Sequence, residues 1–292
     1  MDMRAWWRLL RPAHWVKNLF VLAPLLFARH LFEPALILDA LAAFAAFCLW
    51  SSAVYSLNDV LDAKSDRVHP LKRRRPIAAG EIRPRAALVF ALVLASVATA
   101  GAWLLHPYFA SIGLAYLANN ILYSLWLKRV AFLDVVLIAA GFVMRVVGGA
   151  LAIQVIISPW VVVCTFFLAC LLGFGKRRHE LDMRGEKNAT RPSLGGYTPT
   201  ALRVAELVVA IVTLVSYFFY TIAPGTVDKF GTWWLVATLP FPAFGIYRFL
   251  LLVRSGKQEA PTDMLVTDWP MWINIVAWVG AVAFILYSEA IC

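Results

Sequence analysis

The sequence predicts an all-α integral membrane protein, a polytopic bundle of about nine transmembrane helices with a cytoplasmic N-terminus. The first reason is composition: 62% of the 292 residues are hydrophobic, 15% are charged, and the mean hydropathy is +0.74. A soluble domain has roughly half apolar and a quarter charged residues. The second reason is that the apolar residues form long runs, and the third is that the basic residues gather between alternate runs. Together these features exclude a disordered chain, a secreted disulfide-linked domain and a soluble nucleic-acid-binding domain.

The apolar runs are separated by charged residues or by proline and glycine. A transmembrane helix needs about 20 apolar residues, so the chain is long enough for about nine. The first and sixth runs are short, which indicates tilted or partly interfacial segments. We expect residues 1–292 to form a single membrane domain. The runs cover about 18–32, 35–57, 86–105, 108–126, 132–153, 159–174, 203–223, 232–252 and 270–290.

The positions of the 27 Lys and Arg residues predict the orientation of the chain. All but four lie on one side of the predicted bundle; Arg29 and Lys229 lie on the other side, and Arg145 and Arg248 lie inside runs. Because cytoplasmic loops carry an excess of basic residues, the basic side is predicted to be cytoplasmic. We therefore expect a multi-pass protein of the bacterial plasma membrane. The alternative reading of these charges is that they only set the orientation and meet anionic lipid.

Regularly spaced acidic residues follow the second run. Residues 58–85 read NDVLDAKSDRVHPLKRRRPIAAGEIRPR. Asp59, Asp62 and Asp66 have the spacing i, i+3, i+7. Asn58, Asp62 and Asp66 have the spacing i, i+4, i+8. If the helix of the second run continues through these residues, all four side chains lie on one face of it. Neighbouring carboxylates about 6 Å apart repel by roughly 2–3 kcal/mol per pair at an effective dielectric constant of about 20. The cluster therefore requires positive charge.

Two sources of positive charge are consistent with this spacing. The first is a solvated mixed-charge face made with Lys64, Arg67 and Lys72. The second is Mg²⁺, a hard cation that binds carboxylate oxygens and shares them with substrate phosphates. The run from Lys72 to Arg75 favours the second source, because basic side chains bind the oxygens of a metal-bound diphosphate. Pro70 predicts that the helix ends just before it.

The acidic motif resembles NDxxDxxxD of the UbiA-type membrane prenyltransferases, in which it also follows the second helix. The resemblance implies a nine-helix membrane bundle with a cavity that opens to the cytoplasm. It also implies that an isoprenoid diphosphate or phosphate binds there. Mg²⁺ would be held by Asn58, Asp59, Asp62 and Asp66, and the three aspartates are the implied catalytic residues.

Two further segments help to decide which branch of this family the sequence resembles. The segment from Tyr123 to Lys128 is similar to a Tyr…Lys segment of the family; the alternative reading is an interfacial tyrosine and a snorkelling lysine. Residues 175–182 read GKRRHELD and begin a predicted loop in which ordinary members carry a second acidic motif, DxxxD. Asp182 and Glu186 keep a loose D-x-x-x-E, which leaves acidic metal binding open.

The basic loop resembles one branch of the family, the decaprenyl-phosphate phosphoribosyltransferases. The shared patterns are RPxxWxKN at Arg11–Asn18, HPxKRxRPIAAG at His69–Gly80 and KRxxEL at Lys176–Leu181. This branch implies a Mg-dependent pentosyltransferase that moves 5-phosphoribosyl from phosphoribosyl pyrophosphate to a decaprenyl-type polyprenyl phosphate. The acceptor phosphate oxygen attacks the anomeric carbon and pyrophosphate leaves. In relatives this activity feeds cell-wall biosynthesis.

The resemblance also implies substrate-binding roles. Basic side chains would contact the three phosphate groups, and which base holds which phosphate is open. No general base is required, because the acceptor phosphate is already anionic at pH 7. The implied contacts are Lys72, Arg73 and Arg75 to pyrophosphate, Lys176, Arg177 and Arg178 to the ribose 5-phosphate, Lys17 and Lys128 to the lipid phosphate, with Asn18, Asn58, Tyr123 and Glu180 as further substrate contacts.

Charged residues within or beside the spans are further candidates. A charge in the middle of a span costs about 2.5–3.5 kcal/mol on insertion scales, so Arg145 is a functional candidate. It either binds phosphate or pairs with Asp134 or Glu206. Asp134 either accepts a ribose hydroxyl or caps its helix. Asp263 and Asp268 are weaker candidates.

Two other functions are consistent with parts of the sequence. The first is a UbiA-type prenyltransferase that moves an isoprenoid from its diphosphate to an aromatic or lipid acceptor. The second is a non-catalytic transporter of lipid phosphates, which would require charged or broken helices through the midplane of both halves. The concentration of charge at one face counts against the transporter. The isoprenoid length is left open, and so is whether the protein forms a homo-oligomer.

Overall fold

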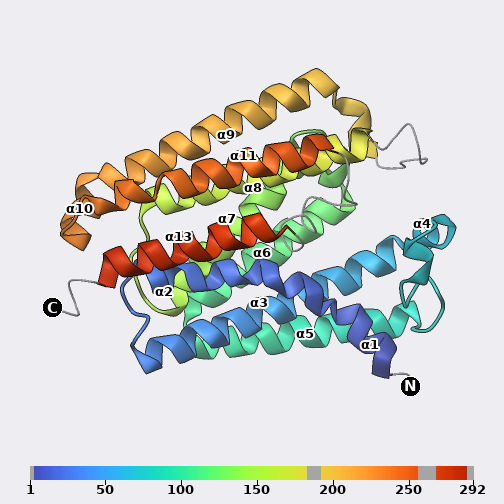
Figure 1. Ribbon diagram of the computed structural model, residues 1–292. Helices are drawn as coiled ribbons and strands as arrows, with labels where there is room; N and C mark the ends of the chain where they lie inside the picture. The colour runs from blue at the N-terminus through green and yellow to red at the C-terminus, as the bar shows by residue number, and fades with distance from the viewer. Residues whose placement is uncertain (1–2, 183–191, 256–267, 288–292) are drawn as a thin grey trace. The chain divides into compact units, whose positions relative to one another are not determined.

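The computed structural model describes residues 3–182, 192–255 and 268–287 (Figure 1). Every regular element within these ranges is a helix, which confirms the predicted all-α class. Many of the helices begin at a proline, because the first helical position needs no N–H donor and the fixed φ of proline suits it. These are α3 (Pro34–Leu61), α5 (Pro84–Leu105), α6 (Pro107–Leu125), α8 (Pro159–Asp182), α9 (Pro199–Ile222), α10 (Pro224–Phe230) and α11 (Pro240–Ser255).

The chain divides into two compact units, which are described separately. Unit 1 comprises Met1–Leu125 and Met144–Ile156, and unit 2 comprises Trp126–Val143 and Ile157–Cys292. The helix α7 (Leu133–Ala152) supplies residues to both units. The assignment of the whole chain to a single domain stays a prediction.

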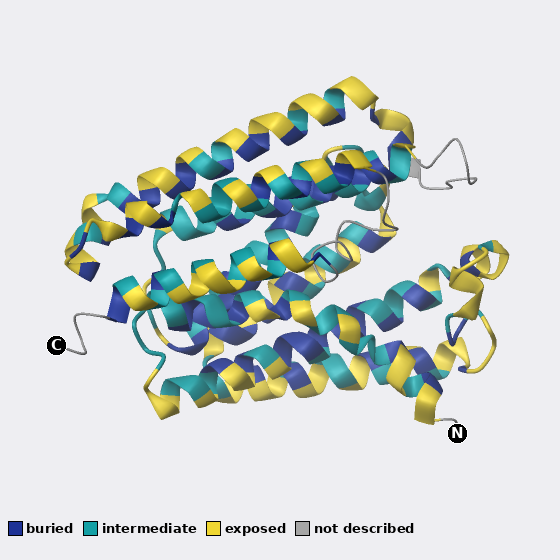
Figure 2. Ribbon diagram, viewed as in Figure 1, coloured by how far each residue is buried: buried dark blue, intermediate teal, exposed yellow. Residues whose placement is uncertain are grey.

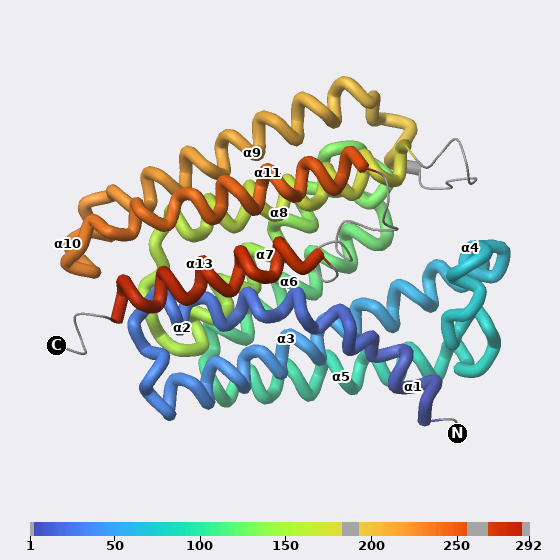
Figure 3. The backbone as a smooth tube through the Cα atoms, viewed as in Figure 1, coloured from blue at the N-terminus to red at the C-terminus, as the bar shows by residue number. Residues whose placement is uncertain are grey.

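Unit 1 is built around the long helix α3, which packs along α5 and along a 3₁₀ helix, η1 (Figure 3). An aromatic cluster fills its core: the ring centroid of Phe47 lies 5.1 Å from that of Trp50 and 5.4 Å from that of Tyr116. A Cβ atom on Gly113 of α6 would lie 2.0 Å from the Trp50 ring, so this close approach requires glycine. The other elements are α1 (Met3–Leu10), η1 (Pro12–Leu22), α2 (Ala23–Phe27), α4 (Ala63–Val68) and η2 (Lys72–Arg74).

Unit 2 is dominated by the packing of α8 on α9. Its core includes Val135, Leu171, Leu202, Phe249 and Met271, all buried. A Cβ atom on Gly173 of α8 would lie 2.7 Å from a methyl of Val135, so the glycine permits close packing on the first turn of α7. The remaining elements are η3 (Leu127–Arg129), η5 (Pro192–Gly196), η6 (Trp234–Thr238) and α13 (Trp269–Tyr287).

The described residues include seven helical segments that are long and apolar enough to cross a membrane. Yellow stripes mark the exposed residues along α5 and α9 (Figure 2). Many of these exposed residues are large and aliphatic, among them Leu92 and Leu207. Apolar surface of this extent is stable in lipid and not in water. The chain is therefore a multi-pass membrane protein. The segments are 34–61, 84–105, 133–152, 159–182, 199–222, 234–255 and 269–287.

Two expected elements differ in the structure. The predicted first span, residues 18–32, corresponds to the second half of η1 and the short α2. A 3₁₀ run as long as the 11 residues of η1 is uncommon, and α7 packs so closely on it that a Cβ on Gly149 would lie 2.0 Å from the Val21 carbonyl oxygen. Residues 175–182, expected in a loop, form the last two turns of α8, and residues 176–182 contain no proline or glycine that would end the helix.

Candidate active site

The acidic motif lies where α3 ends and α4 begins. As predicted, α3 continues through Asn58 and Asp59, but it stops at Leu61. Asp62 has φ −91° and ψ 1° and directly precedes α4, which ends at Val68 just before His69–Pro70. The predicted single helical face is therefore interrupted at Asp62.

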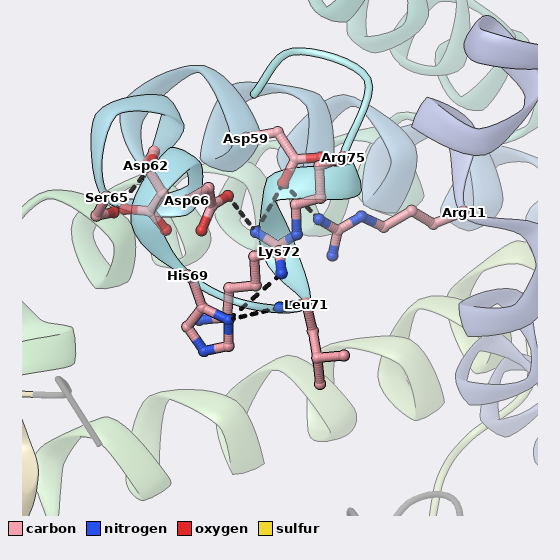
Figure 4. Close-up of polar contacts among 9 residues, drawn as sticks. All are labelled: Arg11, Asp59, Asp62, Ser65, Asp66, His69, Leu71, Lys72 and Arg75. Carbon is pink, nitrogen blue, oxygen red and sulfur yellow. Dashed lines mark hydrogen bonds and ion pairs between the residues drawn. The ribbon is translucent and has the colours of Figure 1, made fainter. Parts of the chain in front are cut away.

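Two of the acidic side chains share a basic partner. In Figure 4, Asp59 and Asp66 both point at Arg75, whereas the backbone carbonyl of Asp62 accepts a hydrogen bond from Ser65 Oγ over 2.8 Å. The Arg75 Nη1 atom donates to Asp59 Oδ1 over 3.1 Å and to Asp66 Oδ2 over 2.7 Å. The side chains of Asp59 and Asp66 are 2% and 4% exposed, so this bridge neutralises two buried charges.

Arg11 also binds this cluster, a contact that the predicted site did not include. Its Nη2 atom donates to Asp59 Oδ1, the same oxygen that Arg75 contacts. Its guanidinium lies 5.2 Å from the ring centroid of Tyr55, one helical turn before Asp59. Two signals were present in the sequence: Arg11 opens the RPAHWVKN segment, and Tyr55 precedes Asp59 by four residues. We call Arg11, Asp59, Asp66 and Arg75 the carboxylate–arginine cluster.

The oxygen atoms of this region fit a divalent metal in their chemistry. Asn58 Oδ1 and Asp59 Oδ2 are buried and accept no hydrogen bond in the described structure. A buried carboxylate oxygen without a donor is costly, and oxygen atoms are the ligands that Mg²⁺ prefers. Within the described residues, however, no three His, Cys, Asp or Glu side chains lie together as a metal site, since Arg75 stands between Asp59 and Asp66.

The basic segment after α4 is folded back by a turn at His69. Its Nδ1 atom accepts hydrogen bonds from the backbone N–H groups of Leu71 and Lys72, each over 3.3 Å (Figure 4). Partial burial and the charge of Lys72 lower the pKa of His69, which keeps the ring a neutral acceptor. Lys72 and Arg73 are exposed, and Arg75 is turned inward. The segment thus carries bases directed to solvent next to the acidic cluster.

Arg145 lies in a second polar network in unit 1. Its Nε atom donates to Asn18 Oδ1 over 2.7 Å, and its Nη2 atom donates to the Tyr116 hydroxyl over 2.9 Å. Asn18, fully buried, donates in turn to Ser51 Oγ over 3.2 Å. The intramembrane charge is therefore held by neutral hydrogen-bonding groups of η1 and α6. Asn18 and Arg145, both predicted to bind substrate, lie together in this network.

Unit 2 contains a buried network around Asp134, which is fully buried. Its Oδ2 atom accepts from Arg177 Nε over 2.6 Å, and its Oδ1 atom accepts from the Tyr197 hydroxyl over 2.6 Å. Arg177 also donates to Glu180 Oε2 over 2.9 Å. Burial, together with the hydrogen bond to Asp134, raises the pKa of Tyr197 far above its usual value, so its hydroxyl remains a donor. Asp134 therefore pairs with Arg177.

Arg178 points to a different acid. It donates to Glu206 Oε2 over 2.7 Å, and the Glu206 side chain is 2% exposed. Arg248 donates to both carboxylate oxygens of Asp268 over 3.2 and 2.9 Å. Asp268 also accepts from the Met271 backbone N–H over 3.0 Å at the start of α13, which assigns Asp268 a structural contact.

The remaining predicted contacts are spread over both units. Lys17 and Tyr123 in unit 1 and Lys128 and Lys176 in unit 2 are each half-buried. Each makes contacts with other side chains or backbone. The predicted candidates Glu186 and Asp263 lie outside the described residues.

Comparison with known proteins identifies the family. Residues 18–276 match the model of the UbiA prenyltransferase family. The chain is 33% identical over 279 residues to the decaprenyl-phosphate phosphoribosyltransferase of Mycobacterium tuberculosis, covering 94% of this chain and 91% of that protein. It is 32% identical over 286 residues to the protein of the same name in Corynebacterium glutamicum, covering 95% and 85%.

Solved structures show the same fold at low sequence identity. A UbiA homologue from Archaeoglobus fulgidus, solved with GPP and Mg²⁺, matches with a TM-score of 0.75 at 17% identity, covering 97% of this chain and 99% of that one. A UbiA homologue from Aeropyrum pernix, solved in its apo form, matches with a TM-score of 0.68 at 18% identity, covering 95% and 98%. The resemblance inferred from the sequence motifs is thus confirmed, and the chain belongs to the UbiA prenyltransferase family.

Proposed function

We propose that the protein transfers 5-phosphoribosyl from phosphoribosyl pyrophosphate to a polyprenyl phosphate. An oxygen of the acceptor phosphate forms a bond to the anomeric carbon of the ribose, and the bond from that carbon to pyrophosphate breaks. The bonding electrons leave with pyrophosphate. The names of the relatives in Mycobacterium tuberculosis and Corynebacterium glutamicum support this reaction. The observation that carries the proposal is the carboxylate–arginine cluster, which combines metal-binding and phosphate-binding groups at one place.

The proposed cofactor is Mg²⁺, held by Asp59, Asp62 and Asp66 with Asn58 as a further ligand. The unpartnered oxygens of Asn58 and Asp59 support this assignment. When bound, the metal would neutralise the charge that grows on the leaving pyrophosphate. The UbiA homologue solved with GPP and Mg²⁺ has the same fold and is consistent with a divalent metal in this family.

The bases of the chain would bind and orient the phosphates. Lys72 and Arg73 are exposed beside the acids, and we assign them with Arg75 to the pyrophosphate oxygens. A charged donor on a phosphate oxygen gives a hydrogen bond about twice as strong as a neutral one. Lys17 and Lys128 are assigned to the lipid phosphate. Because that phosphate is already anionic at neutral pH, no side chain is needed to remove a proton from it.

The ribose 5-phosphate is assigned to the end of α8. Lys176 stays in this role, and Arg178, which is 11% exposed, would take it by exchanging Glu206 for the phosphate. Arg177 takes another role, since it is 1% exposed and bonded to Asp134 and Glu180. We assign Arg177 as a positioning residue that fixes the end of the helix and so the directions of its neighbours. Arg145, held by Asn18 and Tyr116, stays a proposed substrate contact.

The active site is proposed to face the cytoplasm at the bacterial plasma membrane. The clustering of basic residues on one predicted side supports this orientation. Phosphoribosyl pyrophosphate is a water-soluble, highly charged metabolite, so its site must open to an aqueous compartment that contains it. This orientation is tested by labelling the exposed variant Arg73→Cys with a membrane-impermeant thiol reagent. We expect the cysteine to be labelled in inverted membrane vesicles and protected in intact cells. Labelling in intact cells would contradict the orientation.

The reaction is tested with the purified full-length protein. We expect radiolabel from ribose-labelled phosphoribosyl pyrophosphate to enter the organic phase when Mg²⁺ and decaprenyl phosphate are present, and not when EDTA replaces Mg²⁺. Parallel reactions contain radiolabelled isoprenoid diphosphate with an aromatic acceptor. Incorporation only in those reactions would assign the protein to isoprenoid transfer.

A further inference from the structure

Two guanidinium groups lie against the acids that are proposed to hold the metal. Arg75 bridges Asp59 and Asp66, and Arg11 binds the same Asp59 oxygen as Arg75. The side chains of Arg11 and Arg75 are 19% and 27% exposed, whereas the two acids are nearly inaccessible. The acids are therefore fixed in the core of the cluster, and the arginines reach it from the solvent side.

The charges of this cluster balance without a metal. Two carboxylates and two guanidinium groups sum to zero, and each carboxylate is bonded to at least one guanidinium. A divalent cation that joined this arrangement would be placed beside two positive charges, which repel it. Metal and arginine therefore compete for the same carboxylate oxygens, unless the arginines move to another anion.

The backbone of Arg11 points to a function for its side chain. Arg11 has φ 53° and ψ 58°, a left-handed conformation that is uncommon for residues other than glycine. The chain around it is fixed, since the preceding carbonyl of Leu10 accepts from Ser52 Oγ over 2.8 Å. Strained residues cluster at functional sites, where the surrounding structure holds them. Here the strain directs a charged side chain past Tyr55 to Asp59.

We propose that Arg11 and Arg75 are exchange residues, which bind the carboxylates until a metal-bound diphosphate arrives and then bind the diphosphate. Asp59 and Asp66 would then hold the metal with the oxygens that the arginines release, and each guanidinium would bind a phosphate oxygen of the same ligand. No net charge is left uncompensated at any point, because the diphosphate supplies the anions that the arginines lose. The protein therefore binds metal and diphosphate together, and binds metal alone weakly. This inference rests on the proposed function, which places a metal-bound diphosphate at the cluster.

If the exchange occurs, loss of one arginine should strengthen the binding of metal alone and weaken the binding of metal-bound pyrophosphate. In the detergent-solubilised full-length protein, Mn²⁺ alone is titrated by electron paramagnetic resonance of the free ion. Arg75→Gln is expected to bind Mn²⁺ roughly tenfold more tightly than the unsubstituted protein, because a competing charge is gone. Binding of ³²P-labelled pyrophosphate at saturating Mn²⁺ is expected to weaken roughly tenfold in the same variant, because a charged donor is lost. A purely structural role of Arg75 would weaken both.

Matched variants complete the experiment. Arg8→Gln removes the same charge from an exposed arginine that pairs with Glu81, and it is expected to change neither affinity. Asp66→Asn is expected to weaken Mn²⁺ binding, which locates the ion at the cluster. Arg11→Gln is expected to shift both affinities in the same directions as Arg75→Gln, and it carries the test if Arg75→Gln does not fold.

The outcomes separate this inference from the proposed function. Unchanged or weaker Mn²⁺ binding in the arginine variants overturns the exchange, even if the protein transfers phosphoribosyl groups. Mn²⁺ binding that survives Asp66→Asn overturns it as well. Opposite shifts in a protein that transfers no label from phosphoribosyl pyrophosphate would support the exchange and remove the proposed reaction.

Discussion

Arg177 donates a hydrogen bond from Nε to Asp134 Oδ2 over 2.6 Å, and both side chains are almost completely buried. Removal of one partner from such a pair leaves an uncompensated charge and costs about 3–5 kcal/mol. We therefore expect Asp134→Asn to lower the thermal unfolding midpoint of the purified protein strongly. Arg203→Gln, which removes an exposed charge from the same unit, is expected to leave the midpoint nearly unchanged. Equal midpoints for the two variants would contradict a structural role of the pair.

Tyr197 ties the same network to the turn before α7. Its hydroxyl donates to Asp134 and accepts from the Phe132 backbone N–H over 2.6 Å. Because burial raises the pKa of Tyr197 above its ordinary value of 10.0, the unfolded chain loses this proton at lower pH than the folded protein does. The contribution of this group to stability is therefore complete below pH 10 and declines as the pH rises further.

The measurement for Tyr197 is chemical unfolding at a series of alkaline pH values. Tyr197→Phe removes two hydrogen bonds, and we expect it to cost about 1–3 kcal/mol at neutral pH. The difference in stability between Tyr197→Phe and the unsubstituted protein should shrink above pH 10. A difference that is constant up to pH 12 would show that the hydroxyl does not titrate differently in the two states.

The variants Asp62→Asn and Asp59→Asn are expected to lose the same activity but to differ in thermal stability. Both substitutions should abolish transfer, since both carboxylates are proposed metal ligands. Asp59→Asn should also reduce thermal stability, because it weakens the contacts with Arg11 and Arg75. Asp62 is partly exposed at the start of α4, so Asp62→Asn should retain the unfolding midpoint. Near-normal transfer by folded Asp62→Asn would count heavily against the proposed metal site.

Gly149 is expected to be intolerant of a side chain. A Cβ atom there would lie 2.0 Å from the Val21 carbonyl oxygen, and a backbone atom in a packed helix cannot easily move away. We expect Gly149→Ala to reduce folded yield or the unfolding midpoint severely. The matched control is Gly101→Ala in α5, where a Cβ meets no atom within 4 Å. That change should stabilise slightly, by up to about 1 kcal/mol, because alanine favours helix.

Asp268 is expected to contribute stability that disappears in acid. The hydrogen bond from Arg248 lowers the pKa of Asp268 below its ordinary value of 3.8. The stabilisation is therefore present above pH 3.8 and is lost as the pH falls through the lowered pKa of the folded state. Unfolding midpoints measured from pH 6 to pH 3 should fall more steeply for the unsubstituted protein than for Arg248→Gln. Parallel curves would assign the acid sensitivity to other groups.

The sequence alone determined the class of the protein and the family motif. Long apolar runs specify membrane helices because lipid leaves no other partner for backbone polar groups. Proline positions marked the starts of α3 and α5 well, and His69–Pro70 marked the end of α4. These features depend on neighbouring residues in the chain. The spacing of the acids also predicted that Asp59 and Asp66 lie on the same side of the motif, because residues seven apart on a helix share a face, and both contact Arg75.

The tertiary structure decided which side chains meet. Arg11 reaches Asp59 across 48 residues, and Arg177 reaches Asp134 across 43. A basic residue that is distant in sequence from several acids could pair with any of them, so only the packing of the helices determines which acid it contacts. The KRR run illustrates this. The sequence predicted three phosphate contacts there, yet Arg177 is buried against Asp134 and Glu180, and Arg178 pairs with the buried Glu206. The break at Asp62 was not indicated by the spacing of the motif either, since the acids keep helical spacing across it.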